Sequence, residues 1–236
     1  MRSTTALAAT LPTVVRALWR GDEASLVERR AGRDAPPIVL LHGFGTSSRV
    51  LAPLARHLCR ELGRPVVRCA LGGALPLHLG DVRRTARRVH EEIERLAARS
   101  PFDYVDVVGH SLGGLVAAYL LKCLDRGRRI RRVVTLGTPH RGTPLAFVGV
   151  LLLGLVSRAV WQMLPGAPLL RELAAQPVPE GSELIALGSD ADGVVPRTFA
   201  TLLPAPRQAS ARVPDLGHVD FLVSRKSFRF VEAALA

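Results

Sequence analysis

The fold is decided by residues 104–121, which read YVDVVGHSLGGLVAAYLL. The apolar residues at the start of this stretch predict a short buried strand, and the apolar run at its end predicts a helix packed inside the protein. Gly109, Ser111 and Gly113 lie between the two as Gly-x-Ser-x-Gly. On a tight strand-to-helix turn the serine hydroxyl stands exposed at the end of the strand, and side chains at the two glycines would collide with neighbouring backbone. The stretch therefore predicts a nucleophilic serine at position 111.

The helix expected directly after Ser111 adds an electrostatic feature to the turn. Unpaired N–H groups and the helix dipole favour negative charge at a helix N-terminus. We therefore expect the backbone N–H of Leu112 to be one donor to an oxyanion. A five-residue pattern is weak evidence by itself in a chain with 21 glycines, so other segments must supply the remaining groups.

Apolar strands and amphipathic helices alternate through the rest of the chain. Besides the strand before Ser111, strands are expected at 38–41, 65–69, 132–136, 183–188 and 208–213. Alternation of this kind is typical of a parallel sheet with helices on both faces. The sequence therefore predicts an α/β fold, with one domain at 36–236 and a mostly parallel sheet of about six strands.

Residues 1–35 are expected to form a helical leader before this domain. Apolar residues recur along one side of 4–20, but polar residues and Pro12 interrupt the stretch. It is a poor match to a signal peptide, and it is too short and too polar for a membrane span. We expect the leader to pack on the domain, with a position at a membrane surface as the alternative. A cytoplasmic or peripherally membrane-associated location is favoured over secretion.

The composition is basic, with 32 Lys and Arg against 20 Asp and Glu and a net charge of +12. Lys122 and Lys226 are the only lysines. The arginines are scattered over expected solvent-facing positions without interleaved aromatic residues, so we expect no nucleic-acid partner. Attraction to anionic lipid surfaces is a secondary hypothesis. Cys59, Cys69 and Cys123 have no metal-ligand spacing, and we expect neither a metal nor a cofactor.

The alternation of strands and helices breaks between about 141 and 180. A connection this long in a compact domain has structure or function of its own. Residues 145–156 carry no polar side chain, yet the run is too short to cross a bilayer. It can be a helix buried against the sheet, or a lid that turns an apolar side to an acyl chain or a lipid interface. Its position after the serine-bearing part of the sheet favours the lid.

The strand at 38–41 runs into His42-Gly43-Phe44-Gly45. A loop at this place can supply a second donor to an oxyanion, and we assign that role to the backbone N–H of Phe44. His42 is a possible base, but bracing of this loop is the role we favour for it.

A base and an acid are expected after the nucleophile in the chain. A serine hydroxyl is a weak nucleophile until a base takes its proton, and a carboxylate fixes the tautomer of that base. For a serine on this kind of turn, the chain order is serine, acid, histidine. His140 and His218 are the histidines that follow Ser111, and only His218 comes after an acid at a strand end. His218 is therefore the predicted base.

Two acids follow the strand expected at 183–188. We choose Asp192, because the sequence Asp-Gly-Val-Val-Pro places it at a turn, and Asp190 is the alternative. Asp215 lies too close to His218 in the sequence to come from a separate strand end.

Five segments together resemble the α/β-hydrolase lipases and esterases of bacteria, including the triacylglycerol lipases and the GPI-inositol-deacylase-like group. They are HGFG at 42, GHSLGG at 109, GTPHRG at 137, DGVVP at 192 and GH at 217. The resemblance spans residues 36–236 and keeps the order of the family. It implies hydrolysis of carboxylic esters by Ser111, Asp192 and His218, with Phe44 and Leu112 as oxyanion donors. His42, His110 and His140 are candidates for lining the site, and no paired acids are placed for a calcium site.

The sequence as a whole predicts a serine carboxylic-ester hydrolase, a lipase or esterase that acts on lipid-like or acyl esters. Its expected partners are an ester or lipid substrate and, transiently, a membrane or lipid interface. An acyltransferase or thioesterase would use the same three residues, so both remain alternatives. A catalytically inactive hydrolase fold that binds a membrane surface is the alternative from another class.

Overall fold

The structure is a computed structural model, and it describes residues 26–28, 35–71, 80–99, 102–125 and 129–236. Most of the helical leader predicted at 1–35 lies outside these residues. The domain predicted at 36–236 lies largely within them.

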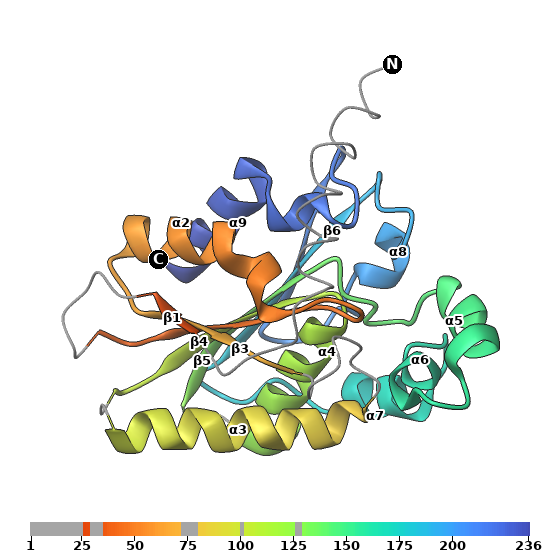
Figure 1. Cartoon of the computed structure of the whole chain (residues 1–236), viewed down its shortest axis with the longest axis horizontal. Coiled ribbons are helices and arrows are strands. Elements are labelled where there is room, and N and C mark those ends of the chain that lie inside the picture. Colours follow the sequence, from red (N-terminus) through yellow and green to blue (C-terminus); the bar gives the residue numbers. More distant parts are fainter. Residues whose placement is uncertain (1–25, 29–34, 72–79, 100–101, 126–128) are drawn as a thin grey trace.

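The described strands form one seven-stranded sheet in the order β1-β3-β2-β4-β5-β6-β7 (Figure 1). Strands β2 to β7 pair in parallel, and β1 pairs antiparallel with β3. The strands are β1 (Leu26–Glu28), β2 (Ile38–Leu41), β3 (Val66–Cys69), β4 (Val105–His110), β5 (Ile130–Leu136), β6 (Glu183–Ser189) and β7 (Gln208–Val213). The mostly parallel α/β sheet of the prediction is confirmed, and the short strand β1 is added to it from within the expected leader.

The strand register explains why the central strands are apolar throughout. A row of neighbours crosses five strands as Val67, Val39, Val107, Val133 and Leu184. All five side chains are buried in the same apolar cluster, together with residues of the helices on that face. The alternate residues of the strands face a second cluster on the opposite side. Both faces of the sheet are thus covered, as near-continuous apolar strands require.

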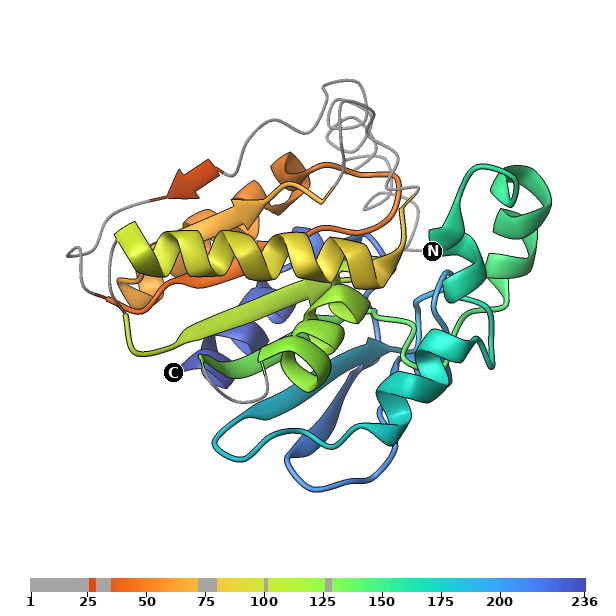
Figure 2. The ribbon, with the colours of Figure 1, turned by 90° about the horizontal axis from the view of Figure 1, so that it is seen from below.

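Helices cover both faces of the sheet. In Figure 1, α3 lies below the sheet and α2 and α9 lie above it, and Figure 2 shows α3 and α4 together over the lower face. The helices outside the insertion are α2 (Ala52–Leu62), α3 (Val82–Arg99), α4 (Leu112–Tyr119), α8 (Arg197–Ala200) and α9 (Arg225–Leu235). Short 3-10 helices span Ser48–Leu51 and Asp220–Leu222, and a π-helical turn, Leu120–Asp125, continues α4.

Three helices fill the long connection between β5 and β6, within the predicted insertion at about 141–180. They are α5 (Leu145–Leu153), α6 (Arg158–Gln162) and α7 (Pro168–Ala175), and they project beyond one end of the sheet (Figures 1 and 2). Within the described ranges, no helix combines the length and hydrophobicity that crossing a membrane requires.

Polar contacts join α6 and α7 to the rest of the domain. The Arg83 side chain of α3 donates to the Glu172 carboxylate of α7, with an Nε–Oε2 distance of 2.9 Å. Lys122 is buried, and its ammonium donates to the carbonyl of Leu173 at 3.0 Å and to the Gln208 side chain at 2.9 Å. The other lysine, Lys226, lies exposed at the start of α9. Lys122 therefore ties the last turn of α7 to the sheet.

Candidate active site

Ser111 occupies the sharp turn between β4 and α4, as predicted. Its backbone has φ +53° and ψ −124°, a combination that residues other than glycine rarely adopt. Its N–H donates to the carbonyl of Leu136 on β5 at 2.9 Å, which fixes the turn against the neighbouring strand. The strain at this position is typical of a functional site whose surroundings hold it in place.

The two glycines of the motif are required by close backbone approach. A Cβ at Gly109 would lie 2.5 Å from the carbonyl oxygen of Gly113, and a Cβ at Gly113 would lie 2.4 Å from the carbonyl oxygen of Leu41. No side chain fits at either place. The collision predicted from the sequence is therefore confirmed. Because Gly113 has no side chain, α4 can pack closely against the end of β2.

The structure brings Ser111, His218 and Asp192 together from three separate strand ends. The Nε2 atom of His218 lies 3.0 Å from Oγ of Ser111, and its Nδ1 atom lies 2.9 Å from Oδ2 of Asp192. Because the carboxylate only accepts, Nδ1 carries the proton and Nε2 is free to accept one from the serine hydroxyl. The Asp192 side chain is fully buried, and that of His218 is 13% exposed. The three groups can pass a proton from the serine to the histidine.

The two candidate acids, Asp192 and Asp190, have different surroundings. The Oδ1 atom of Asp192 accepts from the backbone N–H groups of Val194 and Val195, both at 2.9 Å, which leaves Oδ2 directed at His218. Asp190 instead contacts Arg212 and Arg197 on the surface. The hydrogen bond from Arg212 is the main reason that the pKa of Asp190 lies below its usual value. Asp190 therefore serves a surface ion-pair cluster.

The loop after β2 holds Phe44 beside Ser111. Both residues line the same cavity, and Leu112 is the first residue of α4. His42 braces this loop: its Nε2 atom accepts from the N–H of Leu71 at 3.2 Å, and its Nδ1 atom donates to the carbonyl of Gly43 at 2.9 Å. A histidine with both ring nitrogens used in this way has a structural role.

None of the three histidines proposed to line the site is among the described residues of the cavity wall. His42 is buried in the loop just described. His110 is buried behind His218 and donates to its backbone carbonyl. His140 bonds through Nε2 to the hydroxyl of Thr135 at 2.9 Å, and burial, together with the charge of Lys122, lowers its pKa to about 3. Sequence proximity to the motifs was a poor guide, because each of the three side chains is bonded elsewhere, outside the cavity wall.

The cavity above Ser111 has a volume of about 330 Å³. Its wall is almost wholly apolar and combines the ends of the sheet strands with α5 and α6, from the following residues: Phe44, Ser111, Pro139, Thr143, Leu145, Ala146, Val148, Gly149, Leu152, Val160, Met163, Val194, Val195 and His218. A site of this size and polarity suits a small apolar ligand or part of a larger one. The sequence identified the α5 segment but missed Val194 and Val195, whose signal was their place two and three residues after the acid.

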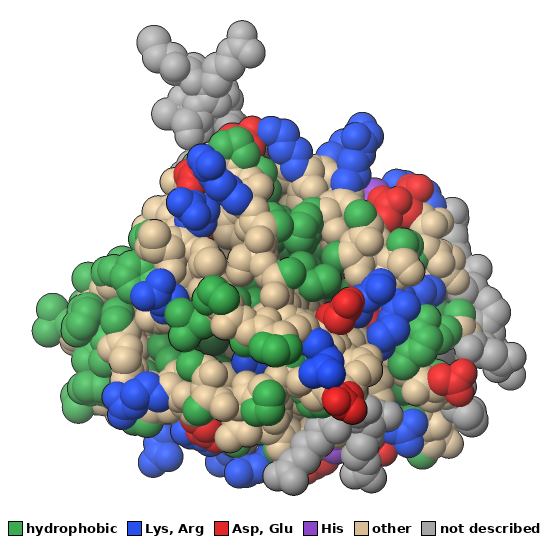
Figure 3. All heavy atoms as spheres, turned by 180° about the vertical axis from the view of Figure 1, so that it is seen from behind, with side chains coloured by type: hydrophobic (Ala, Val, Ile, Leu, Met, Phe, Trp, Pro, Cys, Tyr) green, Lys and Arg blue, Asp and Glu red, His purple; other side chains and the backbone are tan. Residues whose placement is uncertain are grey.

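The outer side of α5, the turn after it and Trp161 of α6 form an exposed apolar surface, which we call the α5 surface. Leu151 is 84% exposed and Leu155 is fully exposed. The surface comprises Leu145, Phe147, Val148, Leu151, Leu152, Leu155, Val156 and Trp161. Apolar side chains gather at this end of the molecule in Figure 3, over α5. Leu145, Val148 and Leu152 belong to both the surface and the cavity wall, so the two are continuous.

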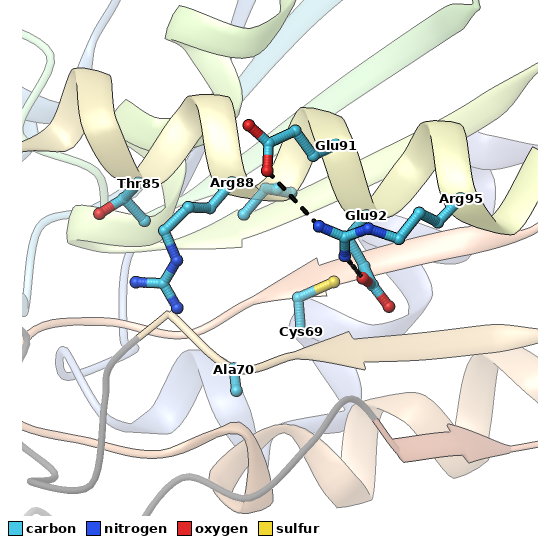
Figure 4. A pocket seen from close by; sticks show the side chains of 8 residues that line it. Cys69, Ala70, Thr85, Arg88, Glu91, Glu92 and Arg95 are labelled. Carbon is cyan, nitrogen blue, oxygen red and sulfur yellow. Dashed lines mark hydrogen bonds and ion pairs between the residues drawn. The ribbon is translucent and has the colours of Figure 1, made fainter.

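A second hollow of about 360 Å³ lies between α3 and the end of β3 (Figure 4). Arg95 contacts both Glu91 and Glu92 on the same helix, and Arg88 also lines the hollow. Among the described residues, no group of three or more His, Cys, Asp and Glu side chains is placed to hold a metal. The side chains arranged for chemistry on a substrate are those around Ser111.

Known proteins resemble this chain at the level of the fold. A family model described as the PGAP1-like alpha/beta domain matches residues 77–161. The mature lipase of Bacillus licheniformis has a TM-score of 0.70 and 16% identity, over 90% of this chain and 98% of that one. Lipase B of Aspergillus fumigatus has a TM-score of 0.70 and 17% identity, over 90% of this chain and 56% of that one. A Bacillus subtilis carboxylesterase has a TM-score of 0.61 and 14% identity, over 100% of this chain and 99% of that one. A search of curated proteins by sequence gave no significant match. The chain has the α/β-hydrolase fold.

Proposed function

We propose that this protein is a serine carboxylic-ester hydrolase that works through an acyl-enzyme. The observation that carries the proposal is the chain of two hydrogen bonds from Ser111 through His218 to Asp192, at the base of an apolar cavity. The lipases and the carboxylesterase with similar folds support it, as does the match to the PGAP1-like domain.

The reaction follows from the positions of the protons. His218 takes the hydroxyl proton of Ser111 at Nε2 as the serine oxygen bonds to the ester carbonyl carbon. Asp192 stabilises the imidazolium that results, because its carboxylate already accepts the Nδ1 proton. His218 then gives its new proton to the departing alcohol oxygen, and the acyl group stays on Ser111. Water repeats the sequence, releasing the acid and restoring the serine.

The oxyanion formed at the carbonyl needs donors on the other side of the cavity. We assign this role to the backbone N–H groups of Phe44 and Leu112, at the ends of β2 and β4. Each such donor typically contributes roughly 3 kcal/mol to the stability of a transition state. The dipole of α4 adds to this stabilisation, because its positive end is at Leu112.

The substrate in this proposal is a lipid-like ester with an apolar acyl chain. The cavity wall offers an acyl chain apolar contacts, and the α5 surface continues from it to the outside. We propose that α5 to α7, within residues 141–180, act as a lid that contacts a membrane or lipid interface transiently. A protein of this kind works as a peripheral protein at the surface from which it takes its substrate.

The experiment that tests this proposal measures initial rates on p-nitrophenyl esters from acetate to palmitate, below and above the solubility limit of each ester. Activity that rises with chain length and with the appearance of an interface is expected. Ser111→Ala should lower the rate by roughly 10⁶-fold. Activity on short soluble esters alone would contradict the lid, and an unchanged rate in Ser111→Ala would contradict the nucleophile.

A second pair of variants tests the acid with a matched control. Asp192→Asn should lower kcat by roughly 10⁴-fold, because the amide no longer holds His218 in the required tautomer. Asp190→Asn removes a carboxylate two residues away and should leave kcat within about twofold. Labelling of Ser111 by a fluorophosphonate without turnover of any ester would favour the acyltransferase. A protein that neither labels nor turns over would be the inactive binding module.

A further inference from the structure

His110, the residue before the nucleophile, is not used by the proposed mechanism. It is the last residue of β4 and is almost completely buried. Its ring lies against that of His218, with 4.8 Å between the ring centroids, and its other aromatic neighbour is Phe221, at 6.5 Å. A buried polar ring in contact with the catalytic base needs a physical explanation.

The hydrogen bonds of His110 define its tautomer. Its Nε2 atom lies 2.9 Å from the backbone carbonyl oxygen of His218, and a carbonyl only accepts, so Nε2 carries the proton. The Nδ1 atom is buried and has no hydrogen-bond partner among the described residues. A Cβ at Gly43 would come within 3.1 Å of Nδ1, so the oxyanion loop lies against this bare nitrogen. The ring thus fills the space between Gly43 and the backbone of His218.

The environment keeps His110 uncharged. Burial, and to a lesser extent the charge of His218, lowers its pKa to about 3. A proton on Nδ1 would have no acceptor there. It would also place a positive charge beside His218 while that residue holds the proton of Ser111. A neutral ring can therefore stay in contact with the base through the whole reaction.

Other hydrogen bonds stabilise the loop that carries His218, but they are made by residues before and after His218. The N–H of Gly217 donates to the Asp220 carboxylate at 2.8 Å, and the N–H of Asp220 donates to the carbonyl of Gly217 at 3.0 Å. The Asp192 contact holds the ring of His218. Within the described part of the chain, the hydrogen bond from His110 is the one that restrains the carbonyl of His218 itself.

We propose that His110 is a positioning residue, whose Nε2–H holds the backbone of His218 so that the imidazole of the base meets the hydroxyl of Ser111. The inference rests on the proposed function of the Ser111 site. It concerns geometry and not substrate contact, because His110 is outside the cavity wall.

Two variants of similar size separate the hydrogen bond from the packing. His110→Gln can place an amide N–H close to the position of Nε2, whereas His110→Leu fills the space without a donor. In the full-length protein, His110→Leu should lower kcat on a soluble p-nitrophenyl ester and the fluorophosphonate labelling rate by about ten- to a hundredfold. Its KM should stay within about twofold. His110→Gln should recover most of the loss.

Wild-type rates in both variants would overturn the inference, as would equal losses in both. Imidazole ¹⁵N NMR of the wild-type protein gives a readout that needs no turnover, with the His110 signal assigned by its absence in His110→Gln. An Nε2–H tautomer that does not titrate between pH 8 and pH 5 is expected, and an Nδ1–H tautomer or a titrating ring would overturn the inference. A wild-type protein inert to every ester and to fluorophosphonate would end the proposed function instead, whatever the NMR result.

Discussion

Helices α4 and α5 are both apolar, and the structure gives them opposite environments. Every residue of α4 is buried, because the helix packs between the sheet and α3. In α5, all of which is described, Ala146 is the buried residue, and the outer side chains face solvent. An apolar composition therefore does not determine whether a helix is buried or what it packs against. Helix α4, which begins just after Ser111, packs on the sheet. For α5 we propose that the partner is a lipid surface.

Truncating one leucine in each helix should give the largest difference between them in the free energy of unfolding. Leu115 of α4 is fully buried, so Leu115→Ala should lower the free energy of unfolding by about 2–5 kcal/mol. Leu151 of α5 is 84% exposed, so Leu151→Ala should change it by less than about 0.5 kcal/mol. Urea denaturation of both variants measures the difference. Similar losses would mean that α5 is packed against protein in solution.

Acid should act on the region around α4 and β5 and not on the α5 surface. The pKa values of His110 and His140 in the folded protein are both lowered to about 3 by burial. The unfolded chain binds protons at each residue as the pH falls through about 6.5, whereas the folded protein does so only near pH 3. Stability is therefore complete above pH 6.5 and declines below it. Between pH 7 and pH 5, each histidine should contribute a loss of about 2 kcal/mol.

Urea denaturation at the two pH values tests this expectation. His140→Gln should reduce the decline by about the share of one histidine, while Leu151→Ala, which removes no titratable group, should leave it unchanged. A free energy of unfolding that is equal at pH 7 and pH 5 would show that the two rings are accessible to protons in the folded state.

Charge placed on the α5 surface should separate binding to lipid from stability. Leu151→Glu combined with Leu155→Glu should lower activity on emulsified esters at least roughly tenfold, because two carboxylates oppose insertion into an apolar phase. The rate on a soluble short ester should stay within about twofold of the wild-type rate. The midpoint of thermal unfolding should stay within a few degrees of the wild-type value. Leu203→Glu, at an exposed leucine outside the surface, is the matched control and should leave all three unchanged. Equal losses on soluble and emulsified esters would argue against a lipid contact.

The smallest effect is expected where α5 packs on α6. A Cβ at Gly149 would lie 3.2 Å from Cγ1 of Val160, a contact that a small shift of one side chain relieves. Gly149→Ala should therefore change the free energy of unfolding by no more than about 1 kcal/mol, with the helix propensity of alanine offsetting the tighter contact. Gly114→Ala in α4 is the contrasting variant, because its Cβ would lie 1.8 Å from Oγ1 of Thr138. Thermal unfolding of the two compares them, and a costly Gly149→Ala would mean that α5 is held rigidly on α6.

Local rules account for what could be predicted from the sequence. The strand-glycine-serine-glycine-helix pattern constrains the backbone within a few residues, and the turn at Ser111 follows from it. The chain order of serine, acid and histidine then limited the partners to His218 and one of two aspartates. Asp192 lies beside His218 as expected, because the N–H groups that follow it hold its second oxygen.

Long-range contacts account for what could not be predicted. Asp106 is fully buried inside β4, where its partners are Arg64, before β3, and Arg131 of β5, at 2.6 Å and 2.7 Å. No spacing in the sequence links these three residues. The position of His110 has the same origin, since its ring is bonded to the backbone of His218 on a distant loop. The exposure of α5 could not be read from its composition, which α4 shares.

The two lysines of the chain have a practical consequence. Lys122 is buried with its ammonium bonded to α7 and Gln208, while Lys226 is exposed at the start of α9 beside Asp215. Guanidinium groups supply the rest of the Lys and Arg charge, and they do not react with amine-directed reagents under mild conditions. Among the described residues, Lys226 is therefore the accessible side-chain amine for a dye or a linker. A sensor chip could hold the folded molecule through Lys226 on α9, which leaves α5 unmodified.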